Sequence, residues 1–163
     1  MPSEREISIY SSRIYKAMMQ LLVREANDDA EKTWLIAHSD NEQVRHAVSK
    51  LSVLALHTID VIGKSEPIKG VDIADRLKVT KGAISKVTRR LLSERLIIRE
   101  KKPENLKEIY FLLTETGRQL FSIHREMHQR LDAEGREVFK AYTADDMEII
   151  CDFLEKLSQI TLD

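Results

Sequence analysis

Lysine and arginine are concentrated in one segment of this sequence, where they could neutralise phosphate groups. Residues 76–107 contain eleven Lys or Arg and three acidic residues, a net charge of +8, whereas the whole chain of 163 residues has a net charge of −1. A positive field concentrated on one short segment is typical of proteins that contact the backbone of nucleic acids. Nucleic-acid binding is therefore the first function that the residue types indicate.

Two histidines could do a second kind of chemistry, the binding of a metal ion. His124 and His128 are four residues apart, and on a helix this spacing places both imidazoles on one face, one turn apart. The motif HREMH is not the H-E-x-x-H of a metalloprotease, because Glu126 is one position too late to serve as the general base. A pair of solvated histidines stays open as the alternative, since five histidines in one chain can produce this spacing by chance.

The remaining sequence lacks the motifs of an enzyme. It has no nucleophile and base at motif spacing and no glycine loop that could cradle a phosphate, and glycine occurs only five times, so we expect no catalysis. Cys151 is the only cysteine, which excludes an intrachain disulfide. Met147, Ile150 and Leu154 flank it at helical spacing, and this pattern favours a packed core thiol over a redox sensor.

Composition indicates a soluble and mostly helical protein. Charged residues make up 33% of the chain, which contains only five Gly and three Pro. The sequence MPSEREISIYSSRIYKAMM has acids and tyrosines where a signal peptide needs an unbroken apolar stretch. No segment approaches the ~20 consecutive apolar residues that cross a bilayer. We expect a cytoplasmic protein without membrane contact.

The cations must be held by local structure, and residues 68–114 follow the order of a winged helix-turn-helix. The pattern predicts a short helix GVDIADRL, a tight turn KVT, a basic helix from Lys81 to Arg95 capped by Thr80, and a two-stranded hairpin. The hairpin comprises LIIRE, the turn KPENLK and the strand EIYFLLT. The residues expected to face the core are Val71, Ala74 and Leu77 in the short helix and Ile84, Val87, Leu91 and Leu92 in the basic helix.

Helices are predicted on both sides of this segment. One covers residues 7–37, with a possible interruption by NDDA at 27–30, and a second covers 41–63 and ends at a glycine. A long helix follows from 114 through at least 139, and Thr143 with Asp146 starts the last one as a capping box. These helices are apolar on one side and too long to pack entirely against a domain of about fifty residues. Two copies of the chain are therefore expected to exchange them in a symmetric homodimer.

The predicted fold class is mainly α with a small β-hairpin wing. We expect one domain over residues 1–163, in which 46–114 form a winged-helix DNA-binding lobe and 1–45 and 115–163 supply the dimerisation helices. Two such lobes would present two basic helices to successive grooves of a DNA duplex.

Small or polar residues at the start of the basic helix suit entry into the major groove, because the backbone approaches the bases there. That start reads Thr80, Lys81, Gly82, Ala83. A solvated basic helix without a ligand, or a winged-helix module that binds an acidic protein partner, is the alternative. The predicted DNA contacts are Thr80, Lys81, Ser85 and Lys86 near base edges or the nearest phosphates, Arg89 and Arg90 on phosphates, and Lys101, Lys102, Asn105 and Lys107 on the backbone or minor groove of the flanking DNA.

The segment IADRLKVTKGAISKVTRRLLSERLIIRE, followed by a Pro-containing wing and FLLTETGRQL, resembles the MarR family of dimeric transcriptional regulators. The flanking helices match the dimerisation elements of that family. The resemblance implies a homodimer that binds a pseudo-palindromic operator in double-stranded DNA and usually represses transcription. The wing departs from the family pattern of an acid followed by Arg, because this chain has Asn105 and Lys107 there. A bidentate fork for the minor groove is therefore absent.

The resemblance also adds to the histidine pair. In the zinc-sensing adhesin-competence repressors of this family, a histidine before the helix-turn-helix joins two histidines four apart after the wing. The matching positions here are His57, His124 and His128, and the N-terminal helix region offers Glu31 or His38 as a fourth ligand. The resemblance thus implies a zinc site that modulates operator affinity. Small aromatic ligands are also common effectors in the family and form the alternative.

Overall fold

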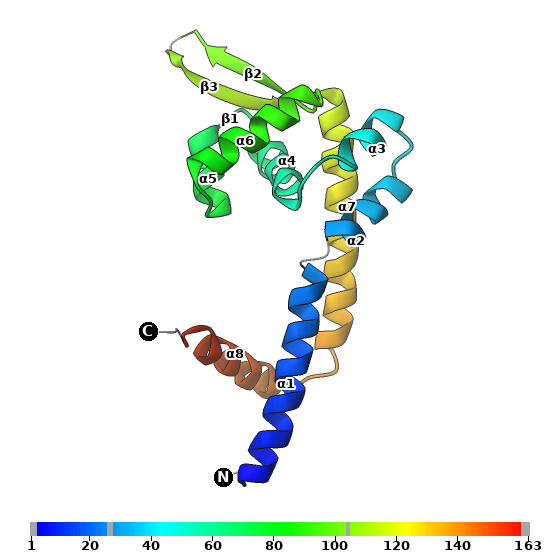
Figure 1. Cartoon of the computed structure of the whole chain (residues 1–163), viewed down its shortest axis with the longest axis vertical. Helices are drawn as coiled ribbons and strands as arrows, with labels where there is room; N and C mark the ends of the chain where they lie inside the picture. Colours follow the sequence, from blue (N-terminus) through cyan, green and yellow to red (C-terminus); the bar gives the residue numbers. More distant parts are fainter. Residues whose placement is uncertain (1–2, 26–27, 104, 161–163) are drawn as a thin grey trace. The chain divides into compact units, whose positions relative to one another are not determined.

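The computed structural model describes residues 3–25, 28–103 and 105–160. The chain begins with two helices, α1 (Glu4–Glu25) and α2 (Asp28–Ala37), which are labelled in Figure 1. The predicted interruption at 27–30 begins at residue 27, which lies outside the described residues. Residues 28–30 themselves are helical and form the first turn of α2.

The single helix predicted over residues 41–63 is wrong, because the chain forms two helices there. Asn41 caps α3 (Glu42–Val48) by accepting a hydrogen bond from the backbone N–H two residues later, at 2.8 Å. Ser52 caps α4 (Val53–Ser65) by accepting a hydrogen bond from the backbone N–H three residues later, at 3.3 Å. Ser, like Asn, satisfies the free N–H groups of a helix start and competes with a continuous helix. The apolar period runs on across this break, which is why it suggested one helix.

The helix-turn-helix is formed by α5 (Gly70–Leu77) and α6 (Lys81–Ser93), which pack against each other and against α4. Thr80 is confirmed as the cap of α6, since its hydroxyl accepts from the backbone N–H of Ala83 at 3.2 Å. The prediction that Val71 faces the core is wrong: its side chain is 37% exposed, whereas Ile73 is fully buried. Val71 lies about 110° around the helix axis from the centre of the buried face. Of the predicted core of α6, Ile84, Val87 and Leu91 are buried and Leu92 is half-buried.

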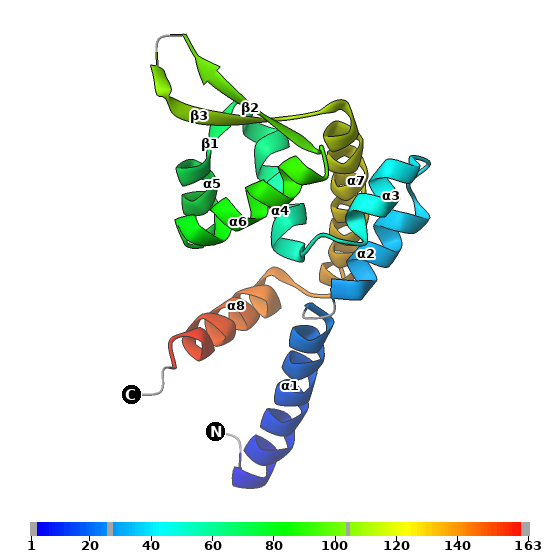
Figure 2. The same ribbon diagram turned by 45° about the horizontal axis from the view of Figure 1, so that its top comes forward.

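A three-stranded antiparallel sheet completes this lobe, in the order β1-β3-β2. The hairpin of β2 (Ile97–Lys102) and β3 (Asn105–Leu113) confirms the predicted wing, and in Figure 2 it extends beyond α6. The short strand β1 (Ile68–Lys69) was not predicted, because two residues cannot show an alternating pattern. Its Ile68 is buried opposite Phe111 of β3, so β1 joins the start of α5 to the wing.

The C-terminal helices are α7 (Glu115–Phe139) and α8 (Ala144–Ser158). The predicted capping box of α8 is confirmed, since the side chains of Thr143 and Asp146 each accept a hydrogen bond from the other's backbone N–H. The hydrogen bond that the Thr143 hydroxyl donates to Asp146 also lowers the pKa of that carboxyl below its usual value. Internal contacts divide the chain into two units, Met1–His124 and Arg125–Asp163, with the boundary inside the continuous helix α7.

Two glycines permit close approaches in the first unit. A Cβ on Gly63 of α4 would lie 2.6 Å from the ring of Phe121, so this glycine makes room for an aromatic side chain instead of ending the helix. A Cβ on Gly117 would lie 2.0 Å from the carbonyl oxygen of Leu96. That carbonyl also accepts from the backbone N–H of Thr114 at 3.0 Å, which joins the start of β2 to the start of α7.

Apolar side chains remain exposed on both terminal helices. On α1 the residues Ile7, Tyr10 and Ile14 are each at least 38% exposed, and no residue of α8 is buried. Cys151 of α8 is exposed, so the packed core thiol is not found in the single chain. Among the described residues, no helix has the length and apolar character needed to cross a membrane. Within the part of the chain that the structure describes, these apolar side chains therefore stay at least partly exposed to water.

Candidate nucleic-acid interface and metal centre

The exposed face of α6 carries the side chains that were predicted to contact DNA. The five residues Lys81, Ser85, Lys86, Arg89 and Arg90 are all exposed, and Gly82 in the first turn is exposed too. The apolar positions of the helix point inward onto α4 and α5. Amphipathic folding therefore leaves one continuous polar and basic face on α6, with its small residues at the N-terminal end.

Arg90 differs from the other cations because it already has an acidic partner. Its guanidinium lies 3.2 Å from Glu94, four residues later on the chain, and the other oxygen of that carboxylate lies 3.7 Å from Lys50. The i, i+4 spacing of Arg90 and Glu94 was visible in the sequence and could have indicated this pair. A phosphate at Arg90 would have to compete with Glu94, whereas Arg89 forms no ion pair among the described side chains.

The wing contributes further cations. Lys101 on β2 and Lys107 on β3 are exposed. The predicted contacts Lys102 and Asn105 lie in the same two strands, but their side chains are outside the described residues. The described part of the hairpin thus adds the exposed cations Lys101 and Lys107 beside α6.

Three histidines predicted as metal ligands lie together. The potential ligand atoms of His57 on α4 and of His124 and His128 on α7 are all within 4.8 Å of one another. The rings of His57 and His124 are 5.8 Å apart between centroids and nearly perpendicular, and His124 is completely buried. Three imidazoles form a donor set that suits zinc, which binds three or four nitrogen, sulfur or oxygen ligands.

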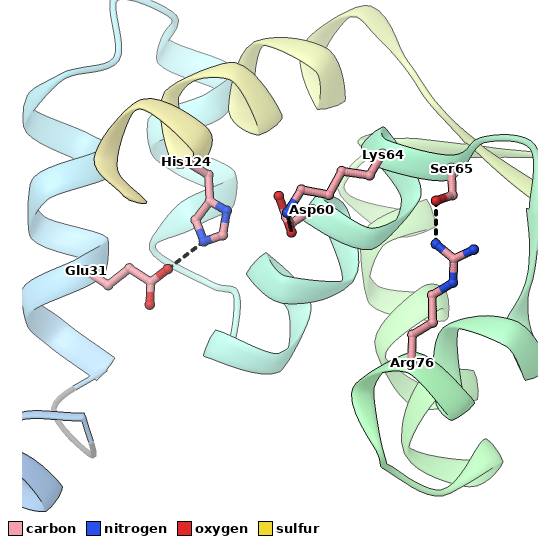
Figure 3. A network of polar contacts seen from close by, with 6 residues as sticks. All are labelled: Glu31, Asp60, Lys64, Ser65, Arg76 and His124. Carbon is pink, nitrogen blue, oxygen red and sulfur yellow. Dashed lines mark hydrogen bonds and ion pairs between the residues drawn. The ribbon is translucent and has the colours of Figure 1, made fainter. Parts of the chain in front are cut away.

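The two residues considered as a fourth ligand have different surroundings. A carboxylate oxygen of Glu31 on α2 lies 2.7 Å from Nε2 of His124, and Figure 3 shows the two side chains pointing toward each other from separate helices. His38 instead stacks on Trp34, with ring centroids 3.8 Å apart, and its Nδ1 lies 2.9 Å from the Trp34 carbonyl oxygen. Carboxylates in contact with a ligating imidazole commonly orient it or join the metal. Glu31 is therefore better placed than His38 to serve a metal at this cluster.

Sequence comparison finds relatives among bacterial regulators. The model of the MarR family matches residues 51–109. The HTH-type transcriptional regulator PchR of Bacillus subtilis is 26% identical over 145 residues, which cover 89% of this chain and 83% of the relative. The uncharacterized HTH-type transcriptional regulator YvnA of the same organism is 31% identical over 108 residues, which cover 66% of this chain and 69% of YvnA.

Solved structures share the fold at lower identity. The adhesin competence repressor AdcR of Streptococcus pyogenes has a TM-score of 0.68 and 16% identity, with coverage of 92% of this chain and 96% of its own. ZitR of Lactococcus lactis, described as a zinc-responsive MarR family member, has a TM-score of 0.62 and 20% identity, with coverage of 75% and 78%. A ZitR mutant bound to DNA has a TM-score of 0.61 and 21% identity, with coverage of 67% and 74%.

Proposed function

This chain belongs to the MarR family of transcriptional regulators, and on that premise we propose that it is a homodimeric repressor whose affinity for its DNA operator is set by zinc. The observation that carries the metal part is the convergence of His57, His124 and His128 within 4.8 Å. The basic face of α6 carries the DNA part. ZitR and AdcR, which share the fold, are described respectively as zinc-responsive and as a repressor.

DNA binding is supported by the order of residues along α6. The small and polar start, Thr80 to Ala83, would allow the backbone to approach base edges, with Lys81, Ser85 and Lys86 as the base-reading or nearest phosphate contacts. Arg89, one turn further, would bind a backbone phosphate. Lys101 and Lys107 of the wing, together with Lys102 and Asn105, would contact the flanking duplex. Arg90 would contribute less because of its pair with Glu94.

Dimerisation is supported by the apolar faces of the terminal helices. Ile7, Tyr10 and Ile14 on α1 and Phe153 and Leu154 on α8 are exposed in the single chain. Burial of such faces against a second copy would remove apolar surface from water and would present two copies of α6 with twofold symmetry. Cys151 lies on α8 and is exposed in the single chain. In the dimer, the partner subunit would cover this helix.

The metal response follows from where the histidines lie in the chain. Zinc bound to His57, His124 and His128, with Glu31 as the fourth ligand, would cross-link α4, α7 and α2, in addition to the contact that already joins Glu31 to His124. His57 lies in α4, and α4 packs directly against α5 and α6. A change in the position of α4 is therefore transmitted to the DNA-binding face through a single layer of contacts.

Wild-type protein is expected to bind duplex DNA with a steep dependence on salt. Lys81, Lys86 and Arg89 in two protomers would make about six phosphate contacts, so the affinity should fall by about a thousandfold between 50 and 200 mM salt. Fluorescence anisotropy of a labelled duplex, selected by the protein from a random library, measures this fall in chelator and in zinc. The affinity should differ between the two conditions by about 5- to 150-fold.

Arg89→Gln provides the residue-level arm of this experiment. The variant should lose affinity equally for operator and nonspecific duplexes and should lower the slope of log affinity against log salt by about 2 per dimer. Lys64→Gln removes the same charge from an exposed side chain that pairs with Asp60 and is the matched control. Binding without salt dependence would contradict the DNA proposal, and equal affinity in chelator and in zinc would contradict the metal proposal. An affinity that changes with salicylate instead of zinc would assign the response to an aromatic ligand.

A further inference from the structure

A second basic surface lies beside α6 and is not part of the predicted DNA contacts, apart from Arg89. A groove of about 710 Å³ runs between the C-terminal half of α6 and the strand β2. Three arginines line it, and we refer to Arg89, Arg95 and Arg99 as the arginine groove. Its remaining walls include the apolar residues Leu92, Ile97 and Ile98.

The backbone at Arg95 is unusual for its residue type. Arg95 has a φ of 56°, in the left-handed region that favours glycine, at the turn where α6 ends. Its N–H bonds to the carbonyl of Leu92, and the N–H of Leu96 bonds to that of Leu91, which is the usual helix-ending arrangement. A side chain in this conformation costs free energy that glycine would avoid. Lys78, which follows α5, has a similar φ. Arg95 differs from Lys78 because its side chain lines the arginine groove.

The electrostatics of the groove favour an anion. No carboxylate is among the lining residues, and none of the three arginines forms an ion pair with the side chains that the structure describes. Arg89 donates its Nε–H to the Ser85 carbonyl at 3.2 Å, which leaves the other four N–H donors of its guanidinium. Guanidinium groups bind phosphate through two parallel hydrogen bonds. The chemistry that fits is a phosphate group.

We propose that the arginine groove binds a backbone phosphate of the DNA that flanks the base pairs contacted by α6. This inference rests on the proposed function. If the N-terminal end of α6 contacts base edges in the major groove of DNA, the C-terminal end of α6 and the neighbouring strand β2 lie toward the edge of that major groove. The phosphate backbone of the DNA passes there. Arg89 already belongs to the recognition face, so Arg95 and Arg99 extend that face outward. The site adds affinity and register without adding sequence preference.

Two duplexes test the proposal. The first duplex contains the sequence that the wild-type protein selects together with the base pairs that flank it in the library. The second duplex contains the selected sequence alone. Arg99→Gln should weaken binding to the first about tenfold, lower the salt slope by about 2 per dimer, and leave binding to the trimmed duplex unchanged. The preference for the selected sequence over a scrambled one should not change. Lys64→Gln again serves as the control of equal charge.

Arg95→Gly separates a binding role from a structural one. Glycine removes the charge and also relieves the left-handed backbone, so the thermal midpoint should rise by about 2–4 °C while affinity for the flanked duplex falls about tenfold. A variant that is more stable but binds less well cannot be explained by misfolding. A merely structural role for Arg95 predicts unchanged DNA affinity together with the higher midpoint.

Other outcomes overturn the inference without affecting the proposed function. Wild-type affinity and slope in both Arg95→Gly and Arg99→Gln, with Arg89→Gln still defective, would show that Arg95 and Arg99 do not contact DNA and that Arg89 acts only from the recognition face of α6. If inorganic phosphate raises the thermal midpoint of the wild type but not of Arg99→Gln, and DNA binding is equal, the groove would bind a free anion instead. Failure of the wild type to bind any duplex would remove the proposed function and the inference together.

Discussion

Replacing His124 with alanine is expected to remove tight zinc binding and, with it, the effect of zinc on DNA affinity. His124 is completely buried and lies between His57, whose ring centroid is 5.8 Å away, and Glu31, whose carboxylate is 2.7 Å from Nε2. Loss of one of three imidazoles should lower zinc affinity by more than about 100-fold, since loss of a supporting partner alone costs 10- to 100-fold. Competition with a chromophoric chelator measures the affinity of the purified, untagged protein.

Because alanine at a buried position also leaves a cavity, the same titration is needed on a second variant. His128→Ala removes a half-buried histidine of the cluster and should give the same loss with less effect on folding. His46→Ala removes an exposed histidine of α3 outside the cluster and is the matched control. Glu31→Gln should lower the affinity for zinc, whereas His38→Ala should leave it unchanged. Equal zinc affinity in the wild type and in the His124 and His128 variants would refute the metal centre.

Gly117→Ala is expected to destabilise the protein more than an alanine at any of the other four glycines. The new Cβ would lie 2.0 Å from the carbonyl oxygen of Leu96, and this atom belongs to the backbone and cannot rotate away. The same carbonyl accepts the hydrogen bond from the Thr114 N–H that fixes the start of α7. Displacing it should cost about 3 kcal/mol or more, out of a total stability of about 5–15 kcal/mol. Urea unfolding followed by circular dichroism gives the free energy of unfolding.

The same helix offers the opposite case as a control. Gly135 of α7 has no atom within 4 Å of the position of a Cβ. Gly135→Ala should therefore gain the helix propensity of alanine without a clash and should raise the free energy of unfolding by about 0.5–1 kcal/mol. If both substitutions change stability by the same small amount, the close approach at Leu96 does not constrain the fold.

Periodicity predicted the elements of the winged helix but not its smallest parts. The caps Thr80 and Thr143, the hairpin and the long helix α7 all have local signals, namely a hydroxyl before an apolar period or alternating β-branched residues. The break between α3 and α4 was missed because residues 44, 48, 51 and 55 keep the helical period across it. The strand β1 exists only because β3 lies beside it, and such a long-range partner leaves no trace in two residues.

The candidate site was predictable where it depended on spacing and not where it depended on tertiary contact. The pair His124 and His128 follows from helix geometry, and only the resemblance to a family pointed to His57. The choice between Glu31 and His38 needed the structure, since it depends on which side chain reaches a residue more than ninety positions later. Arg95 and Arg99 were overlooked as ligands because neither follows the helical period of α6, and only the fold brings them beside Arg89.

His57, His124 and the neighbouring carboxylate of Glu31 come from segments that are far apart in the chain. Their meeting in the fold has a consequence for the lifetime of the protein. An unfolded chain cannot hold these side chains together, so a metal bound there would stabilise only the folded state, by about 4 kcal/mol at a thousand times its dissociation constant. A difference of 1–2 kcal/mol already changes how often proteases meet an unfolded chain. Metal scarcity would then reduce the amount of the regulator as well as its activity.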